Sequence, residues 1–168
     1  MSLNIKLENL VKMDVDAIVN AANKELLPGG GVCGAIFQGA KSKSLEMDCK
    51  KLGPIKTGQA VITSAYNLPC KYIIHAVGPI YRDGLSGEEE FLRNAYINSL
   101  KLAKKHSIKS IAFPLISAGI YGYPLKEACK IAVDTIREFL KKEDMDVTIA
   151  VLDPNIYDIL TKLWTVSY

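Results

Sequence analysis

The chain has 168 residues and a mass of 18.4 kDa, which fits a single domain. Hydrophobic residues make up 49% of it and charged residues 23%, a balance typical of a folded chain rather than a disordered one. The net charge of +3 is small and is not gathered in one stripe, so nucleic acid is not expected as a partner. No stretch matches a membrane-spanning helix or a signal peptide, and we therefore expect a cytoplasmic protein without membrane contact.

The cysteines and histidines do not form a metal-binding pattern. No two cysteines form a C-x-x-C pair, and the chain has only two histidines. We therefore expect free thiols in a reducing cytosol, no metal and no cofactor. The residues concerned are Cys33, Cys49, Cys70, Cys129, His75 and His106.

Short apolar runs predict buried strands, and the amphipathic stretches between them predict helices. In chain order, strands are expected near residues 5–7, 17–19, 60–63, 72–77, 111–115 and 147–152. Helices are expected over 88–105 and 125–142, with a last one opening at Asp153 and Pro154. Ser86 and Glu89 predict a capping box for the first of these. This alternation predicts an α/β sandwich with a largely parallel or mixed sheet, in which ligands bind at the carboxyl ends of strands.

Two glycine-containing loops follow predicted strands. The first runs over residues 20–34 and includes Asn20, Asn23 and the glycines from Gly29 to Gly34, and the second covers 117–122. Glycines let the backbone approach a ligand, and amides at a helix N-terminus favour anions. Two such loops on neighbouring strands could hold a diphosphate from both sides. Alternatively, the glycines only form turns.

The glycines of the first loop also satisfy the G-x-G-x-x-G dinucleotide fingerprint. A Rossmann loop turns directly from strand to helix, whereas here about nine residues separate Val19 from Gly29. The next strand is not expected before about Ala60, so the compact βαβ unit is missing. A dinucleotide-binding fold of that type is therefore disfavoured.

Individual side chains suggest different roles at these loops. Asn23 offers amide groups suited to sugar hydroxyls, whereas Asn20 is expected to satisfy backbone groups in a turn. Tyr121 offers an aromatic ring that could pack on a ribose. His75, inside an apolar run, is expected to be a core histidine, and His106, after two lysines, is expected to be solvated.

Four motifs, in this order and spacing, resemble the macrodomain family. They are Asp16–Asn23 (DAIVNAAN), Gly29–Val32 (GGGV), His75–Pro79 (HAVGP) and Ser117–Gly122 (SAGIYG). The resemblance implies a single macrodomain over 1–168, with a three-layer α/β/α fold and a six-stranded mixed sheet. It also implies a cleft for ADP-ribose. Many family members remove mono-ADP-ribose from acidic side chains or deacetylate O-acetyl-ADP-ribose, and others only bind.

The resemblance also assigns roles to residues of this chain. Asn23 and Cys33 are the candidate catalytic residues, and no metal site is implied. The expected partners are ADP-ribose or O-acetyl-ADP-ribose and mono-ADP-ribosylated proteins. The candidate ligand-binding residues are Asn9, Leu10, Asn20, Asn23, Gly30, Gly31, Val32, Cys33, Ser117, Ala118, Gly119, Ile120, Tyr121, Leu152 and Asp153.

Three positions depart from the family pattern. Asn9 stands where the family places an acidic residue for adenine, Cys33 stands where active members commonly carry Asp, and Phe37 replaces a histidine. A helix N-terminus can lower a thiol pKa, so a reactive Cys33 thiolate is conceivable. Substrate-assisted attack by a water held by Asn23 and the glycine loop needs no such nucleophile. The leading hypothesis is an ADP-ribosyl-ester hydrolase, and the alternative is a non-catalytic reader of ADP-ribose.

Overall fold

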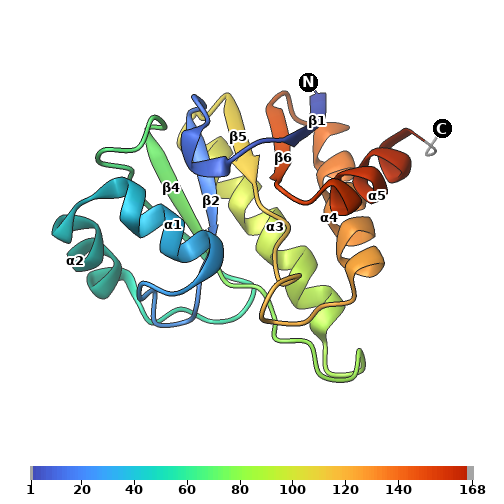
Figure 1. The fold of residues 1–168 in the computed structure, drawn as a ribbon, viewed down its shortest axis with the longest axis horizontal. Coiled ribbons are helices and arrows are strands. Elements are labelled where there is room, and N and C mark those ends of the chain that lie inside the picture. The colour runs from blue at the N-terminus through green and yellow to red at the C-terminus, as the bar shows by residue number, and fades with distance from the viewer. Residues whose placement is uncertain (1, 166–168) are drawn as a thin grey trace.

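A computed structural model describes residues 2–165 of the chain. Within these residues, six strands form one sheet and five α-helices pack around it (Figure 1). The strands are β1 (Ser2–Leu7), β2 (Ala17–Ala21), β3 (Ala60–Ser64), β4 (Tyr72–Ala76), β5 (Ser110–Phe113) and β6 (Asp146–Val151). The helices are α1 (Gly31–Ala40), α2 (Lys43–Leu52), α3 (Glu88–Lys105), α4 (Leu125–Leu140), α5 (Pro154–Thr165) and a short 3-10 helix, η1 (Leu10–Lys12). No helix in this part of the chain is long and apolar enough to cross a membrane.

The sheet is mixed, with the strand order β1-β6-β5-β2-β4-β3. Every neighbouring pair is parallel except β3 and β4, which are antiparallel. β2 lies between β5 and β4, so Ala17 is in register with both Ile111 and Tyr72. Because the carboxyl ends of parallel strands meet at one edge, the loops after β2, β4 and β5 lie close together.

Apolar side chains cover both faces of the sheet. On one face, α3, α4 and α5 pack against the strands around Tyr96 and Phe113, whose rings are 5.2 Å apart. On the other face, α1, α2 and η1 bury a second cluster that includes Ile36 and Leu45. Figure 1 shows α1 and α2 on one side and α4 and α5 on the other. The three-layer α/β/α fold that the resemblance implies is thus confirmed.

Helix α3 begins differently from the sequence prediction. Its N-cap is Gly87, in the left-handed region at φ 81°, and no side chain caps it. The carboxylate of Glu88 instead accepts a hydrogen bond from the Ser86 amide at 2.7 Å. The predicted capping box of Ser86 and Glu89 is therefore wrong, because Glu88 bonds the backbone that precedes the helix.

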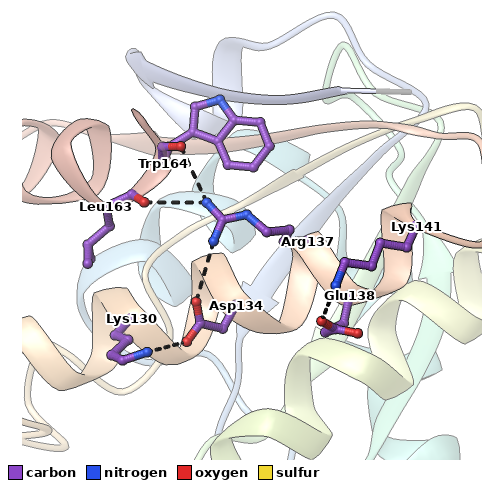
Figure 2. Close-up of polar contacts among 7 residues, drawn as sticks. All are labelled: Lys130, Asp134, Arg137, Glu138, Lys141, Leu163 and Trp164. Atoms are coloured by element: carbon purple, nitrogen blue, oxygen red, sulfur yellow. Dashed lines mark hydrogen bonds and ion pairs between the residues drawn. The ribbon is translucent and has the colours of Figure 1, made fainter. Parts of the chain in front are cut away.

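Polar contacts tie α4 to the end of α5 (Figure 2). Arg137 donates hydrogen bonds to the carbonyls of Leu163 and Trp164, both at 3.3 Å, and its guanidinium lies 4.8 Å from the Trp164 ring centroid. A cation here complements the negative end of the α5 dipole. Asp134 holds the same guanidinium at 3.6 Å. These contacts fix α5 against α4, on the side of the sheet away from α1.

Candidate functional site

A cavity of about 280 Å³ lies between the loops that follow β2 and β5. The β2 loop contributes Asn23 and residues 29–33, and the β5 loop contributes residues 114–117 and 119–121. Both loops leave the same edge of the sheet because β2 and β5 are parallel neighbours. The structure therefore brings together most of the predicted site residues: Asn23, Gly30, Gly31, Val32, Cys33, Ser117, Gly119, Ile120 and Tyr121.

The glycines of the first loop open space in front of a helix N-terminus. Helix α1 begins at Gly31, which has a φ of +56°, and no side chain caps it at Gly30. A Cβ added at Gly30, Gly31 or Gly119 would meet no atom within 4 Å. The first amides of a helix have no partner within the helix and favour anions. This wall can therefore accept a phosphate at close range.

Hydrogen bonds hold the β2 loop in place. The Asn23 side chain donates to the Leu27 carbonyl at 2.9 Å and accepts from the Leu27 amide at 3.0 Å. The Cys33 thiol donates to the same carbonyl at 3.5 Å. Farther along, Gly34 fits only as glycine, because a Cβ would lie 2.4 Å from the Gly29 oxygen. Hydrogen bonds to Leu27 within the same segment thus hold both candidate catalytic residues, Asn23 and Cys33, in place.

Cys33 is buried in the first turn of α1. Burial raises the pKa of its thiol, and this effect outweighs the opposing hydrogen bond from Asn20, 3.8 Å away. A raised pKa keeps the sulfur protonated at neutral pH. Burial of Cys33 thus opposes the thiolate that the sequence left open at this helix N-terminus.

Behind this wall, Asn20 and His75 form a buried polar chain. Asn20 lies inside β2 and is 1% exposed, so the predicted role in a turn is wrong. Its amide nitrogen is 3.0 Å from His75 Nδ1, and Nε2 of that ring is 2.9 Å from the Thr63 hydroxyl. Burial lowers the pKa of His75 to about 4. His75 is thus a hydrogen-bonded core histidine, as predicted, and His106 is exposed, also as predicted.

The opposite wall contains a strained serine without a hydrogen-bond partner. Ser117 has a φ of +67°, a region that non-glycine residues seldom adopt. Its side chain is buried, and among residues 2–165 its hydroxyl has no hydrogen-bond partner. Buried polar groups are normally paired, so this hydroxyl on the cavity wall is open to a hydrogen bond with a molecule in the cavity. The neighbouring Ile120 is 93% exposed.

Gly78, for which the sequence alone predicted no individual role, lies in the cavity wall close to Ser117. It follows β4 and lines the cavity, and a Cβ there would lie 2.2 Å from the Ser117 hydroxyl oxygen. Tyr121, which is half-buried, accepts a hydrogen bond from the Tyr81 amide through its carbonyl. The sequence signal for Gly78 is its place in the HAVGP motif, but only the fold shows how close Gly78 comes to Ser117.

Six of the predicted ligand-binding residues do not line this cavity: Asn9, Leu10, Asn20, Ala118, Leu152 and Asp153. Asn9 caps η1 by accepting from the Val11 amide, and Asp153 likewise accepts from the Asn155 amide at the start of α5. The Leu10 side chain is buried in the core, whereas Leu152 is 72% exposed. An adenine contact by these residues stays a prediction.

Known proteins resemble this chain in sequence and in overall fold. The sequence model described as Macro domain matches residues 19–132. A macro domain-containing protein of Methanosarcina mazei is 53% identical, with 84% of this chain aligned to 75% of that protein. The O-acetyl-ADP-ribose deacetylase of Escherichia fergusonii is 49% identical, over 80% and 77% of the two chains. The Oceanobacillus iheyensis macrodomain, solved with ADP, superposes with a TM-score of 0.93 at 39% identity, over 97% and 90%. The chain belongs to the macrodomain family.

Proposed function

We propose that the chain binds ADP-ribose in this cavity and hydrolyses mono-ADP-ribosyl esters on acidic side chains, or O-acetyl-ADP-ribose. One observation carries the proposal: the unpaired Ser117 hydroxyl lines the same cavity as the uncapped N-terminus of α1. A diphosphate between them would receive hydrogen bonds from both loops. The O. iheyensis macrodomain with ADP and the E. fergusonii deacetylase support this choice of ligand.

The ribose distant from the adenine fits the end of the cavity at Asn23 and Tyr121. Asn23 still has one amide hydrogen and one lone pair free after its bonds to Leu27. Its side chain can therefore hold a ribose hydroxyl without releasing the loop. Tyr121 also lines the cavity, and its ring can pack on the sugar.

The proposed hydrolysis uses a positioned water rather than a protein nucleophile. Cys33 is protonated, and no Asp, Glu or His lines the cavity among the residues described. A water held by Asn23, the glycine-loop amides and the substrate's own phosphate would attack the ester carbonyl carbon or the anomeric carbon. The bond between the attacked carbon and the ester oxygen would break, the phosphate would take a proton from the water, and ADP-ribose and the free carboxylic acid would leave. Orientation and fixed backbone dipoles supply the acceleration in such a mechanism.

The lack of a charged catalytic side chain in the described cavity lining favours a second candidate function. A cavity lined by no Asp, Glu or His among residues 2–165 suits a reader that binds free or protein-linked ADP-ribose without cleaving it. The names of relatives do not separate the two functions. The ADP-ribose glycohydrolase MACROD2 of Xenopus laevis is 50% identical over 80% of this chain, but that alignment spans only 32% of the larger protein.

Loss of label from an automodified ADP-ribosyltransferase, followed over time, tests the proposal. Release of ADP-ribose by the wild-type chain supports hydrolysis. Retention of the label together with binding of ADP-ribose assigns the reader function. Retention of the label without any binding contradicts both.

A further inference from the structure

A second cavity, of about 390 Å³, adjoins the first and shares Asn23, Gly78 and Tyr121 with it. Its other walls come from residues 24–25, from Thr57, and from the segment between β4 and the start of α3. We propose that this second cavity holds the polypeptide to which the ADP-ribosyl group is attached. This inference rests on the proposed function, since it places the ADP-ribose in the first cavity.

The shared residues fix which part of a substrate reaches the second cavity. Asn23 and Tyr121 are the residues assigned above to the distal ribose, whose anomeric carbon carries the ester. Whatever is esterified to that carbon leaves the first cavity past these two side chains. The second cavity is thus continuous with the site on the acyl side of the bond.

The size of the second cavity argues against a small acyl group. Even at the roughly 30 Å³ that a water molecule takes in the liquid, the heavy atoms of an acetyl group would fill about 90 Å³. The cavity measures about 390 Å³. An acetyl ester would leave most of it to water, whereas an aspartyl or glutamyl side chain with its neighbouring residues would fill it.

The walls of the second cavity offer the contacts that a polypeptide uses. Ile80 and Phe91 line it and are 57% and 41% exposed, an apolar surface for aliphatic side chains. Arg82 and Lys24 are exposed, and neither forms an ion pair with any residue in 2–165 that the structure records. Arginine and aromatic residues dominate the binding energy of protein interfaces.

Glu88 holds this wall in a fixed shape. Its carboxylate accepts hydrogen bonds from the amides of Arg82, Asp83 and Gly84 at 3.0 to 3.1 Å, and from Ser86 at 2.7 Å. These bonds, that of Arg82 foremost, lower the pKa of Glu88 to about 2. A wall ordered before binding reduces the entropy lost when a partner docks.

The charges favour a polypeptide over a nucleic acid. Two carboxylates, Glu25 and Glu88, line the second cavity beside Lys24 and Arg82. The net charge of the walls is therefore close to zero, and a run of phosphates would face the Glu25 carboxylate. Nucleic-acid grooves are strongly cationic instead.

Calorimetry with two ligands tests the proposal without needing turnover. The first ligand is free ADP-ribose. The second is a short peptide with ADP-ribose joined to a glutamine side chain by an N-glycosidic bond, which replaces the labile glutamyl ester. We expect the wild-type chain to bind the peptide conjugate about tenfold more tightly than ADP-ribose. A 5′-phosphate-linked ADP-ribosyl oligonucleotide serves as the competing class of ligand.

Two variants and one control locate the gain in affinity. Phe91→Ala and Arg82→Ala should each remove about threefold or more of the peptide advantage and leave the affinity for free ADP-ribose unchanged. Arg93→Ala, on α3 but outside the second cavity, is the matched control and should keep the advantage.

The outcomes distinguish this inference from the proposed function. Equal affinity for peptide conjugate and ADP-ribose, or a gain that survives both variants, overturns the inference alone. Tighter binding of the oligonucleotide than of the peptide also overturns it. If neither ADP-ribose nor the conjugate binds, the proposed function fails as well.

Discussion

The two walls of the first cavity differ in how completely they are hydrogen-bonded. On the β2 side, Asn23 bonds Leu27 at both ends of its amide, and Cys33 bonds the same carbonyl. On the β5 side, Ser117 is strained, and its buried hydroxyl has no partner among residues 2–165, while Ile120 is almost fully exposed. On the β2 side, hydrogen bonds within the loop thus hold the side chains, while the uncapped first amides of α1 stay open to a ligand. On the β5 side, the Ser117 hydroxyl is a side-chain group that a bound diphosphate can pair.

Removing the side chain that organises the β2-side wall should have the largest effect. Asn23→Ala deletes both bonds to Leu27 and the group that orients the ribose. We expect ADP-ribosyl-ester hydrolysis to fall roughly ten- to a thousandfold because orientation is lost. Single-turnover release of ADP-ribose from a glutamate-modified protein measures this. An unchanged rate would show that Asn23 takes no part in the reaction.

Lowering the pH should destabilise the folded protein through His75, which lies behind the same wall. Burial lowers its pKa to about 4, below the ordinary 6.5. Between these values the unfolded chain binds a proton that the folded protein excludes. The free energy of unfolding should therefore fall as the pH drops from about 6.5 to about 4, by on the order of 3 kcal/mol, with no further loss from this group at lower pH.

Urea unfolding at a series of pH values measures that loss. His75→Asn should flatten the slope between pH 6.5 and 4, whereas His106→Asn, at an exposed histidine, should keep it. Glu88 acts in a separate window: its pKa is lowered to about 2, so the stability it contributes is lost as the pH falls from about 4.5 toward 2. An equal slope in both histidine variants would contradict the assignment to His75.

Deleting the unpaired hydroxyl should separate binding from stability. Ser117→Ala removes a hydroxyl that has no partner among residues 2–165, so the melting temperature should not fall. Its affinity for ADP-ribose should drop about fivefold, close to 1 kcal/mol. Thr63→Val is the matched control, because it leaves His75 Nε2 without its 2.9 Å partner and should lower stability while preserving affinity. Loss of stability in Ser117→Ala would mean that the hydroxyl is already paired.

The smallest effect is expected at Cys33. A protonated thiol that donates to the Leu27 carbonyl can be replaced by a hydroxyl of similar geometry. Cys33→Ser should therefore keep most of the single-turnover rate. If Cys33→Ser abolishes turnover while ADP-ribose affinity stays intact, the thiol is catalytic and the positioned-water mechanism is wrong.

The sequence predicts the fold well because most of its strands are centred on short apolar runs and two of its loops are marked by glycine. All six strands occur, and the helices over 88–105 and 125–142 form, the second ending two residues early at Leu140. The two glycine loops do meet on one cavity, as their places after neighbouring strands predict.

Contacts between residues far apart in the chain escape such reasoning. Asn20 is expected in a turn from its local sequence, but β2 extends through it in backbone register with His75 of β4, 55 positions later. The ring nitrogen of that histidine lies 3.0 Å from the Asn20 amide nitrogen. Ser117 combines a positive φ with a buried hydroxyl that has no partner among residues 2–165, and no sequence pattern marks either feature. The second cavity depends on Glu88 gathering four backbone amides, which only the folded loop brings together.

Titration calorimetry with ADP-ribose and AMP tests the central claim most directly. If both walls of the first cavity hold one diphosphate, ADP-ribose should bind at micromolar affinity or tighter, equivalent to about 8 kcal/mol. AMP should bind much more weakly, because it cannot reach from one loop to the other. Equal affinities for the two ligands, or no heat with ADP-ribose, would contradict the claim that this cavity is an ADP-ribose site.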